Sequence, residues 1–232
     1  FGLRSCAVSA VGDDEAGREL RNQLREKRVG HMLETVPFPT GTVEVTLDGA
    51  GIPSYEIRQG VAWDNIPFTP QIEELARHTR AACFGSLAQR SPVSHRTIGR
   101  FLETMPDGEG QYKVFDINLR QHFYTQQVVE ESLRKCNILK INDEELAVVG
   151  GMFGMEGMQP GEQCRTLLDR YGLRIVILTC GAAGSSVFAL DTRSYIPTPR
   201  VEVADTVGAG DSFTASFLAC LLYTSPSPRD TR

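Results

Sequence analysis

Features typical of several protein classes are missing from this sequence. The four histidines have no spacing of the kind that metal ligands show, and no apolar run approaches the roughly 18–20 residues of a membrane span. The first six residues do not resemble a secretory signal peptide. The P-loop motif Gly-x-x-x-x-Gly-Lys-Ser/Thr occurs nowhere. These absences disfavour a histidine metal site, a membrane protein and a P-loop ATPase.

An excess of positive charge is also missing. The chain has 24 lysines and arginines against 29 aspartates and glutamates, so its formal net charge is −5, and its pI is about 5.5. A protein that binds nucleic acid usually presents a basic face. We therefore expect no nucleic-acid partner. Because an apolar run and a signal peptide are also missing, we expect no membrane partner and a location in the cytoplasm.

Cysteine is present, but never in the C-x-x-C spacing that is common in zinc and redox sites. Most of the six cysteines lie in apolar strand-like or helix-like segments. We therefore expect reduced thiols in the core of a cytoplasmic protein, rather than zinc ligands or disulfides. The six residues are Cys6, Cys83, Cys136, Cys164, Cys180 and Cys220.

The length and the hydrophobic pattern predict one α/β domain, or one such domain with a small appendage. The chain has 232 residues, of which 41% are hydrophobic and 23% charged, which is ordinary for a globular protein. A strand at 6–11 and a helix to about Lys27 come first. From residue 70 onward, short apolar strands alternate with amphipathic helices, which predicts a mostly parallel sheet covered by helices on both faces. The strands expected there are 81–85, 113–117, 138–141 and 174–179.

Residues 36 to 66 have a different pattern. Residues 42–47 and 55–58 alternate between polar and apolar side chains around a turn at 48–51, which predicts a β-hairpin with one apolar face. Such a hairpin either packs on the surface of the body or forms a lid that excludes water from a substrate. Trp63, where the chain returns from the hairpin, is either a packing anchor or a platform for a sugar ring.

The segment at 205–213, Asp-Thr-Val-Gly-Ala-Gly-Asp-Ser-Phe, precedes an apolar helix. Small residues before a helix let backbone N–H groups approach an anion, and the positive end of the helix adds to the attraction. A carboxylate at Asp211 would repel that anion, so it makes most sense as a base that removes a proton from an attacking hydroxyl. Alternatively, Gly208 and Gly210 form a tight turn and Asp211 caps the helix.

Other polar residues follow the predicted parallel strands at their carboxyl ends, where ligands of such sheets bind. Asn118 and Arg120 follow the strand at 113–117, and they are either site residues or part of a solvated loop. Asn142 and Glu145 have the spacing of a helix capping box. The Gly-x-x-Gly link of Gly181 and Gly184 is common in hairpins, and Thr179 precedes it.

The segment at 205–213 fills every specified position of the pattern Asp-Thr-x-Gly-Ala-Gly-Asp-x-Phe. It resembles the C-terminal signature of the ribokinase-like (PfkB) carbohydrate kinases. The resemblance implies a ribokinase-like three-layer α/β/α sandwich with a mostly parallel sheet and a small β-hairpin lid. We expect residues 1–35 and 67–222 to form the α/β kinase core and residues 36–66 the lid.

The resemblance also implies a role for each candidate residue. Asp211 would be the catalytic base, and Gly208, Ala209 and Gly210 the anion hole for the transferred phosphoryl group. Asn142, Thr179, Gly181 and Gly184 would bind the nucleotide, and Glu145 would bind Mg²⁺ through a water molecule. Asn118 and Arg120 would bind the sugar or the transferred phosphate. Asp205 and Val207 would bind a monovalent cation.

We therefore expect an ATP-dependent carbohydrate kinase, most similar to fructokinases, that uses ATP, Mg²⁺ and K⁺ and dimerises through the lid. The alternatives are a family member acting on ketodeoxygluconate, ribose or a nucleoside, or an inactive nucleotide-binding fragment. The family's opening strand and its closing helices have no counterpart here. Residues 223–232 hold two prolines in a Ser/Arg-rich run, so we expect a fragment with a non-native tail and little activity of its own.

Overall fold

The computed structural model describes residues 2–47, 53–200 and 207–224. The chain divides into two compact units. Unit 1 consists of Phe1–Arg77 and Ala88–Thr104, and unit 2 of His78–Leu87 and Met105–Arg232. Among the described residues, no helix combines the length and the apolar character needed to cross a bilayer.

Unit 1 opens with two parallel strands joined by a helix. Strand β1 (Cys6–Val11) pairs with β2 (Gly30–Thr35), and α1 (Glu15–Glu26) connects them. The predicted first strand and helix are confirmed, although only the last two residues of β1 are buried. The sequence pattern did not predict β2, whose side chains are half-buried or exposed and do not alternate clearly.

Asp14 organises the turn between β1 and α1. Its carboxylate caps α1 by accepting the N–H of Gly17 at 2.8 Å, and it also accepts the N–H of Thr40 at 2.7 Å and the hydroxyl of Thr40 at 2.6 Å. These bonds, above all the one from the Thr40 hydroxyl, lower the pKa of Asp14. A Cβ at Gly12 would lie 2.6 Å from the carbonyl oxygen of Phe38, so this position requires glycine. One local motif thus ties α1 to the segment that leads into the hairpin.

The predicted hairpin is present as two antiparallel strands. Strand β3 (Val43–Leu47) pairs with β4 (Pro53–Ile57) from Val43 opposite Ile57 to Leu47 opposite Pro53. The predicted turn at 48–51 lies outside the described residues. After the hairpin come the 3₁₀ helix η1 (Ala62–Asn65) and the helices α2 (Pro70–Arg77) and α3 (Pro92–Thr104). The core of unit 1 is formed by Ala10, Ala62, Ile66 and Ile72.

A buried ion pair holds the base of the hairpin. The carboxylate of Asp64 accepts Nε of Arg90 at 2.8 Å and Nη2 at 3.0 Å, and Arg90 also donates to the carbonyl oxygen of Arg58. The guanidinium lies 4.1 Å from the ring centroid of Trp63, and a Cβ at Gly41 would lie 2.1 Å from the indole nitrogen. Within unit 1, Trp63 therefore has the contacts of a packing anchor.

Unit 2 is built on a six-stranded sheet of order β10-β9-β8-β7-β6-β5. Strands β5 to β8 are parallel, and β9 and β10 continue the sheet with antiparallel pairing. The predicted mostly parallel sheet is confirmed. The strands are β5 (Ala81–Phe84), β6 (Tyr112–Asp116), β7 (Ile138–Asn142), β8 (Ile175–Thr179), β9 (Ser185–Ala189) and β10 (Thr192–Ile196). Strand β10 was not predicted, and all five of its residues are exposed.

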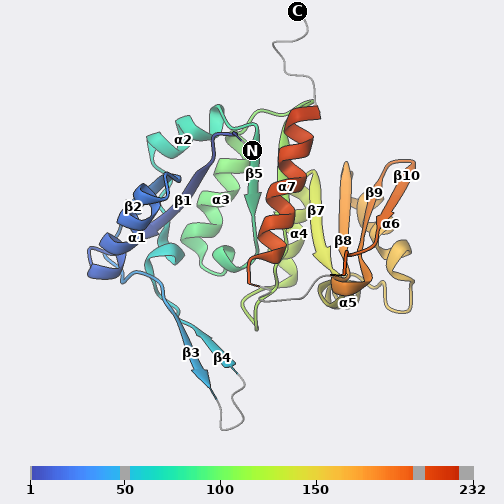
Figure 1. Ribbon diagram of the computed structural model, residues 1–232, viewed down its shortest axis with the longest axis horizontal. Helices are drawn as coiled ribbons and strands as arrows, with labels where there is room; N and C mark the ends of the chain where they lie inside the picture. The colour runs from blue at the N-terminus through green and yellow to red at the C-terminus, as the bar shows by residue number, and fades with distance from the viewer. Residues whose placement is uncertain (1, 48–52, 201–206, 225–232) are drawn as a thin grey trace, which may run out of the picture. The chain divides into compact units, whose positions relative to one another are not determined.

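Helices cover both faces of this sheet, so unit 2 has three layers (Figure 1). One face packs against α4 (Gln126–Lys135), α5 (Asp143–Met152) and α6 (Pro160–Tyr171). The other face packs against α7 (Ala209–Thr224). The alternation of side chains along a strand explains the division, because Phe115 and Leu139 belong to the first core while Val114 and Ile138 belong to the second.

The cysteines correct one expectation. All six are free thiols, but only Cys136 and Cys164 are buried. The prediction of core thiols was wrong for Cys6, Cys83 and Cys220, which are exposed. An apolar segment has a face or an end that no neighbour covers, and these three residues lie there.

Candidate active site

The polar residues predicted as site residues gather at the carboxyl edge of the parallel strands in unit 2. Asn142 ends β7 and Thr179 ends β8, and the two are partners in the parallel register. Asp116 ends β6 and is the register partner of Lys140 in β7. The topology thus brings together residues that are far apart in the sequence, as expected for a ligand site of this kind of sheet.

The start of α7 lies at the same edge. Gly208 has a φ of +76°, a conformation that favours glycine, and its carbonyl oxygen accepts the first helical hydrogen bond from Ser212 at 2.8 Å. The N–H groups of residues 209–211 therefore have no acceptor within the helix, and the helix dipole makes this end positive. Asp211 lies exposed in the first turn, as predicted. This arrangement is suited to binding an anion at the N–H groups of the first turn, next to the carboxylate of Asp211.

A polar network ties this first turn to the strands. The ammonium of Lys140 lies 2.9 Å from both carboxylate oxygens of Asp116, and the hydroxyl of Thr214 donates to Asp116 at 2.8 Å. A Cβ at Gly210 would lie 3.4 Å from Nζ of Lys140. The sequence patterns did not point to Lys140 or Thr214 as site residues. A lysine inside the apolar strand Ile-Leu-Lys-Ile-Asn was the available signal, because a buried ammonium requires a partner.

The capping box of α5 is present in full. Asn142 Oδ1 accepts the N–H of Glu145 at 2.8 Å, and Glu145 Oε2 accepts the N–H of Asn142 at 2.9 Å. Glu145 Oε1 also accepts the N–H of Leu119 at 2.9 Å. Burial raises the pKa of Glu145 despite these bonds. Both oxygens already hold a backbone N–H, so contact with a metal through a water molecule fits this carboxylate better than direct ligation.

Two turns carry the other predicted residues. Asn118 has a φ of +43°, which asparagine tolerates, and its carbonyl oxygen accepts the hydroxyl of Ser86 at 3.4 Å. Arg120 is exposed, and no carboxylate in the described part of the chain pairs with it. Gly181 and Gly184 have φ of +50° and +101°.

The predicted nucleotide-binding turn is held rigidly. A Cβ at Gly184 would lie 2.5 Å from the carbonyl oxygen of Ile196, and Thr198 donates its hydroxyl to the carbonyl oxygen of Gly181 at 2.6 Å. The two predicted cation ligands are Asp205 and Val207. Asp205 lies outside the described residues, and Val207 is 83% exposed. Within the described ranges, no group of three or more His, Cys, Asp or Glu side chains could ligate a metal directly.

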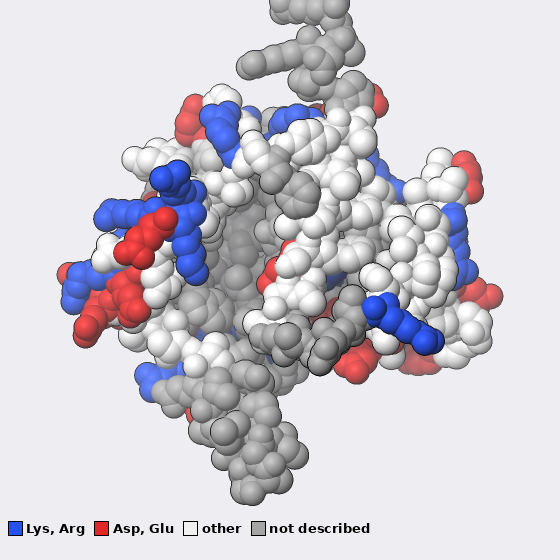
Figure 2. Space-filling model, in the orientation of Figure 1, with Lys and Arg blue, Asp and Glu red and all other residues white. Residues whose placement is uncertain are grey.

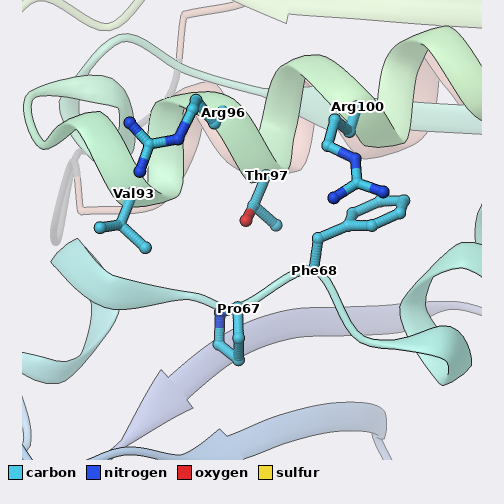
Figure 3. Close-up of a pocket in the computed structure, with 6 residues that line it drawn as sticks. All are labelled: Pro67, Phe68, Val93, Arg96, Thr97 and Arg100. Atoms are coloured by element: carbon cyan, nitrogen blue, oxygen red, sulfur yellow. The ribbon is translucent and has the colours of Figure 1, made fainter.

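Two cavities lie away from Asp211, one in each unit, and the one in unit 2 is lined in part by Leu178, Cys180 and Ala183, the chain neighbours of the predicted residues Thr179, Gly181 and Gly184. In unit 1, a pocket of about 250 Å³ lies between the segment Pro67–Phe68 and one side of α3, where Arg100 covers the ring of Phe68 (Figure 3). In unit 2, a groove of about 910 Å³ is lined by Leu178, Phe188 and Arg193, among others. Leu178 and Phe188 belong to the core on the α6 face, which is opposite to α7. Neither cavity contains Asp211.

A family model described as pfkB family carbohydrate kinase matches residues 1–227. An uncharacterized sugar kinase of Pyrococcus horikoshii is 26% identical over 230 residues, which are 96% of this chain and 69% of that protein. A fructokinase of Rhizobium leguminosarum is 27% identical over 229 residues, with coverages of 95% and 67%.

A third relative is named for a different substrate, a riboside. The aminoimidazole riboside kinase of Salmonella typhimurium is 25% identical over 223 residues, which are 92% of this chain and 67% of that protein. Its crystal structure from Salmonella enterica, in complex with aminoimidazole riboside and an ATP analogue, superposes with a TM-score of 0.72 at 21% identity and coverages of 96% and 72%. The Pyrococcus crystal structure superposes with a TM-score of 0.78 at 25% identity and coverages of 95% and 70%.

Proposed function

The chain belongs to the pfkB family of carbohydrate kinases, and from this premise we propose that it transfers the γ-phosphoryl group of ATP to a sugar hydroxyl, with fructose as the sugar. In this reaction the hydroxyl oxygen forms a bond to phosphorus, the bond from the γ-phosphorus to ADP breaks, and the hydroxyl proton passes to a base. We assign the role of base to Asp211.

The observation that carries this proposal is the position of the first turn of α7. Gly208, Ala209 and Gly210 form the turn at the positive end of the helix, where the N–H groups of residues 209–211 have no helical acceptor, and the carboxylate of Asp211 belongs to the same turn. An anion hole of this kind stabilises charge as it develops on the transferred phosphoryl group, and each donor of an oxyanion hole is typically worth about 10²–10³ in rate. The carboxylate beside it removes the proton as the new bond forms.

The other residues at the strand ends have roles that follow from their chemistry. We assign nucleotide binding to Asn142, Thr179 and the turn of Gly181 and Gly184. Mg²⁺ would neutralise phosphate charge, with Glu145 holding it through water. Asn118 and the exposed cation Arg120 would bind the sugar or the transferred phosphate. We also assign K⁺ binding to Asp205 and to the backbone carbonyl oxygen of Val207.

The hairpin keeps its predicted role. We propose that residues 36–66 form a lid over the substrate and a dimer interface, attached to a kinase core of residues 1–35 and 67–222. The contacts of Thr40, Trp63 and Arg90 support this assignment, because they anchor both ends of the hairpin to the rest of unit 1.

Replacement of Asp211 by asparagine tests the proposal. Asparagine keeps the shape of the side chain but cannot accept the proton, so turnover should fall by about 10²–10⁴-fold while ATP binding persists. A coupled ADP-release assay measures turnover, and calorimetry measures ATP binding. Turnover close to that of the unmodified chain would remove Asp211 from the role of base.

A panel of acceptors tests the choice of sugar. Relatives of nearly equal identity include a fructokinase and an aminoimidazole riboside kinase, so the second candidate is a nucleoside-type acceptor. The same assay with fructose, ribose, ketodeoxygluconate and a nucleoside ranks kcat/KM. A higher value for any of the last three replaces fructose as the substrate. ATP binding without turnover on any acceptor would instead identify an inactive nucleotide-binding protein.

A further inference from the structure

A buried polar network lies directly below the start of α7, and the reaction as proposed does not use it. Lys140 is 8% exposed, and its ammonium lies 2.9 Å from each carboxylate oxygen of Asp116. The side chains of this pair are 10% and 14% exposed. A buried ion pair contributes little net stability compared with apolar residues of the same volume, and its best-attested use is to fix how elements are arranged.

Thr214 connects the pair to α7. Its hydroxyl lies 2.8 Å from Asp116 Oδ2 and 3.0 Å from the carbonyl oxygen of Gly210, one turn earlier. The hydroxyl has one proton, and the charged carboxylate is the stronger acceptor. Gly210 lies beside the pair, because a Cβ there would be 3.4 Å from Nζ of Lys140, an ordinary van der Waals distance. The start of α7 is therefore tied to the strands by one directional hydrogen bond, from Thr214 to Asp116.

The rest of α7 cannot provide this control. Its contacts with the sheet are apolar and are made by Phe213, Phe217, Leu218, Leu221 and Leu222. The surface over the middle of α7 also consists of uncharged side chains (Figure 2). Apolar attraction is non-directional, so a helix that is apolar on several sides can rotate or slide at small cost. The hydrogen bond from Thr214 to Asp116 favours one rotation of α7 about its own axis, because it forms only when Thr214 faces β6.

We propose that Asp116, held by Lys140, is a positioning residue that sets the first turn of α7 through Thr214. The inference rests on the proposed function, because that turn carries Asp211 and the N–H groups of the anion hole. A displacement of about 1 Å at a reacting group can cost on the order of 10²-fold in rate. No bond is made or broken by these three residues during the reaction.

Three variants of the full chain test this proposal. Thr214→Val removes the hydroxyl, and Thr214→Ser keeps it. Thr224→Val is the matched control, because Thr224 lies in the same helix and donates to the carbonyl oxygen of Cys220, four residues earlier, at 2.8 Å. We expect Thr214→Val to lower kcat about 10- to 100-fold with the KM values for ATP and sugar changed less than about threefold. Thr214→Ser and Thr224→Val should stay near the original kcat.

Hydrogen–deuterium exchange supplies a measurement that does not depend on turnover. Residues 209–214 should exchange faster in Thr214→Val than in Thr214→Ser, with equal melting temperatures. Equal kcat and equal exchange in the two Thr214 variants would overturn the proposal. Full activity of Asp211→Asn would instead overturn the proposed base, so the two failures are distinguishable.

Discussion

Replacement of Arg90 by methionine should destabilise unit 1 severely. The side chains of Arg90 and Asp64 are only 6% and 5% exposed, and two hydrogen bonds of 2.8 and 3.0 Å join them. Methionine retains most of the apolar stem of arginine but removes the charge. Asp64 keeps the N–H groups of Gly60 and Val61, but its carboxylate is then buried without a cation. Loss of one partner of a buried pair costs about 3–5 kcal/mol.

This loss is large compared with the stability of a typical domain, which is about 5–15 kcal/mol. Urea unfolding at pH 7 measures it as a fall in the midpoint. The matched control is Arg100→Met, because Arg100 also lies 4.1 Å from an aromatic centroid, that of Phe68, but is exposed and has no ion pair in the described ranges (Figure 3). This control should lose about 0.5–1 kcal/mol. If Arg90→Met loses no more than Arg100→Met, the reasoning about the buried pair is wrong.

Two further predictions concern the candidate site. In urea unfolding, Gly184→Ala should lower the free energy of unfolding more than Gly172→Ala does. Both glycines have positive φ, but only at Gly184 would a Cβ lie 2.5 Å from a carbonyl oxygen. Equal losses of stability in the two variants would contradict this prediction. Burial raises the pKa of Glu145 in the folded state, so the stability it contributes is present below about pH 4.3 and is lost as the pH rises through the folded value. From pH 4 to pH 7, the unmodified chain should therefore lose stability relative to Glu145→Gln, and parallel pH profiles would refute this.

Local patterns determined a large part of this protein. The capping box of Asn142 and Glu145 and the place of Asp211 in the first turn of α7 involve neighbouring residues, so the sequence was sufficient to predict them. The alternation of strands and helices predicted the mostly parallel sheet for a similar reason, since only one arrangement buries such strands on both faces. The strands β2 and β10 were missed because none of their side chains is buried and neither strand has an apolar alternation: β2 is mostly half-buried and β10 is exposed throughout.

Contacts between distant segments were decided only by the tertiary structure. Asp116 meets Lys140 across 24 residues and Thr214 across 98 residues, and nothing in the local sequence of any of the three names its partners. The sequence by itself established that a lysine occupied an apolar strand and that a glycine-rich turn preceded a helix. The parallel register of β6 and β7 and the packing of α7 on them then placed these groups within hydrogen-bonding distance, because in a folded chain the neighbours of a side chain are set by topology.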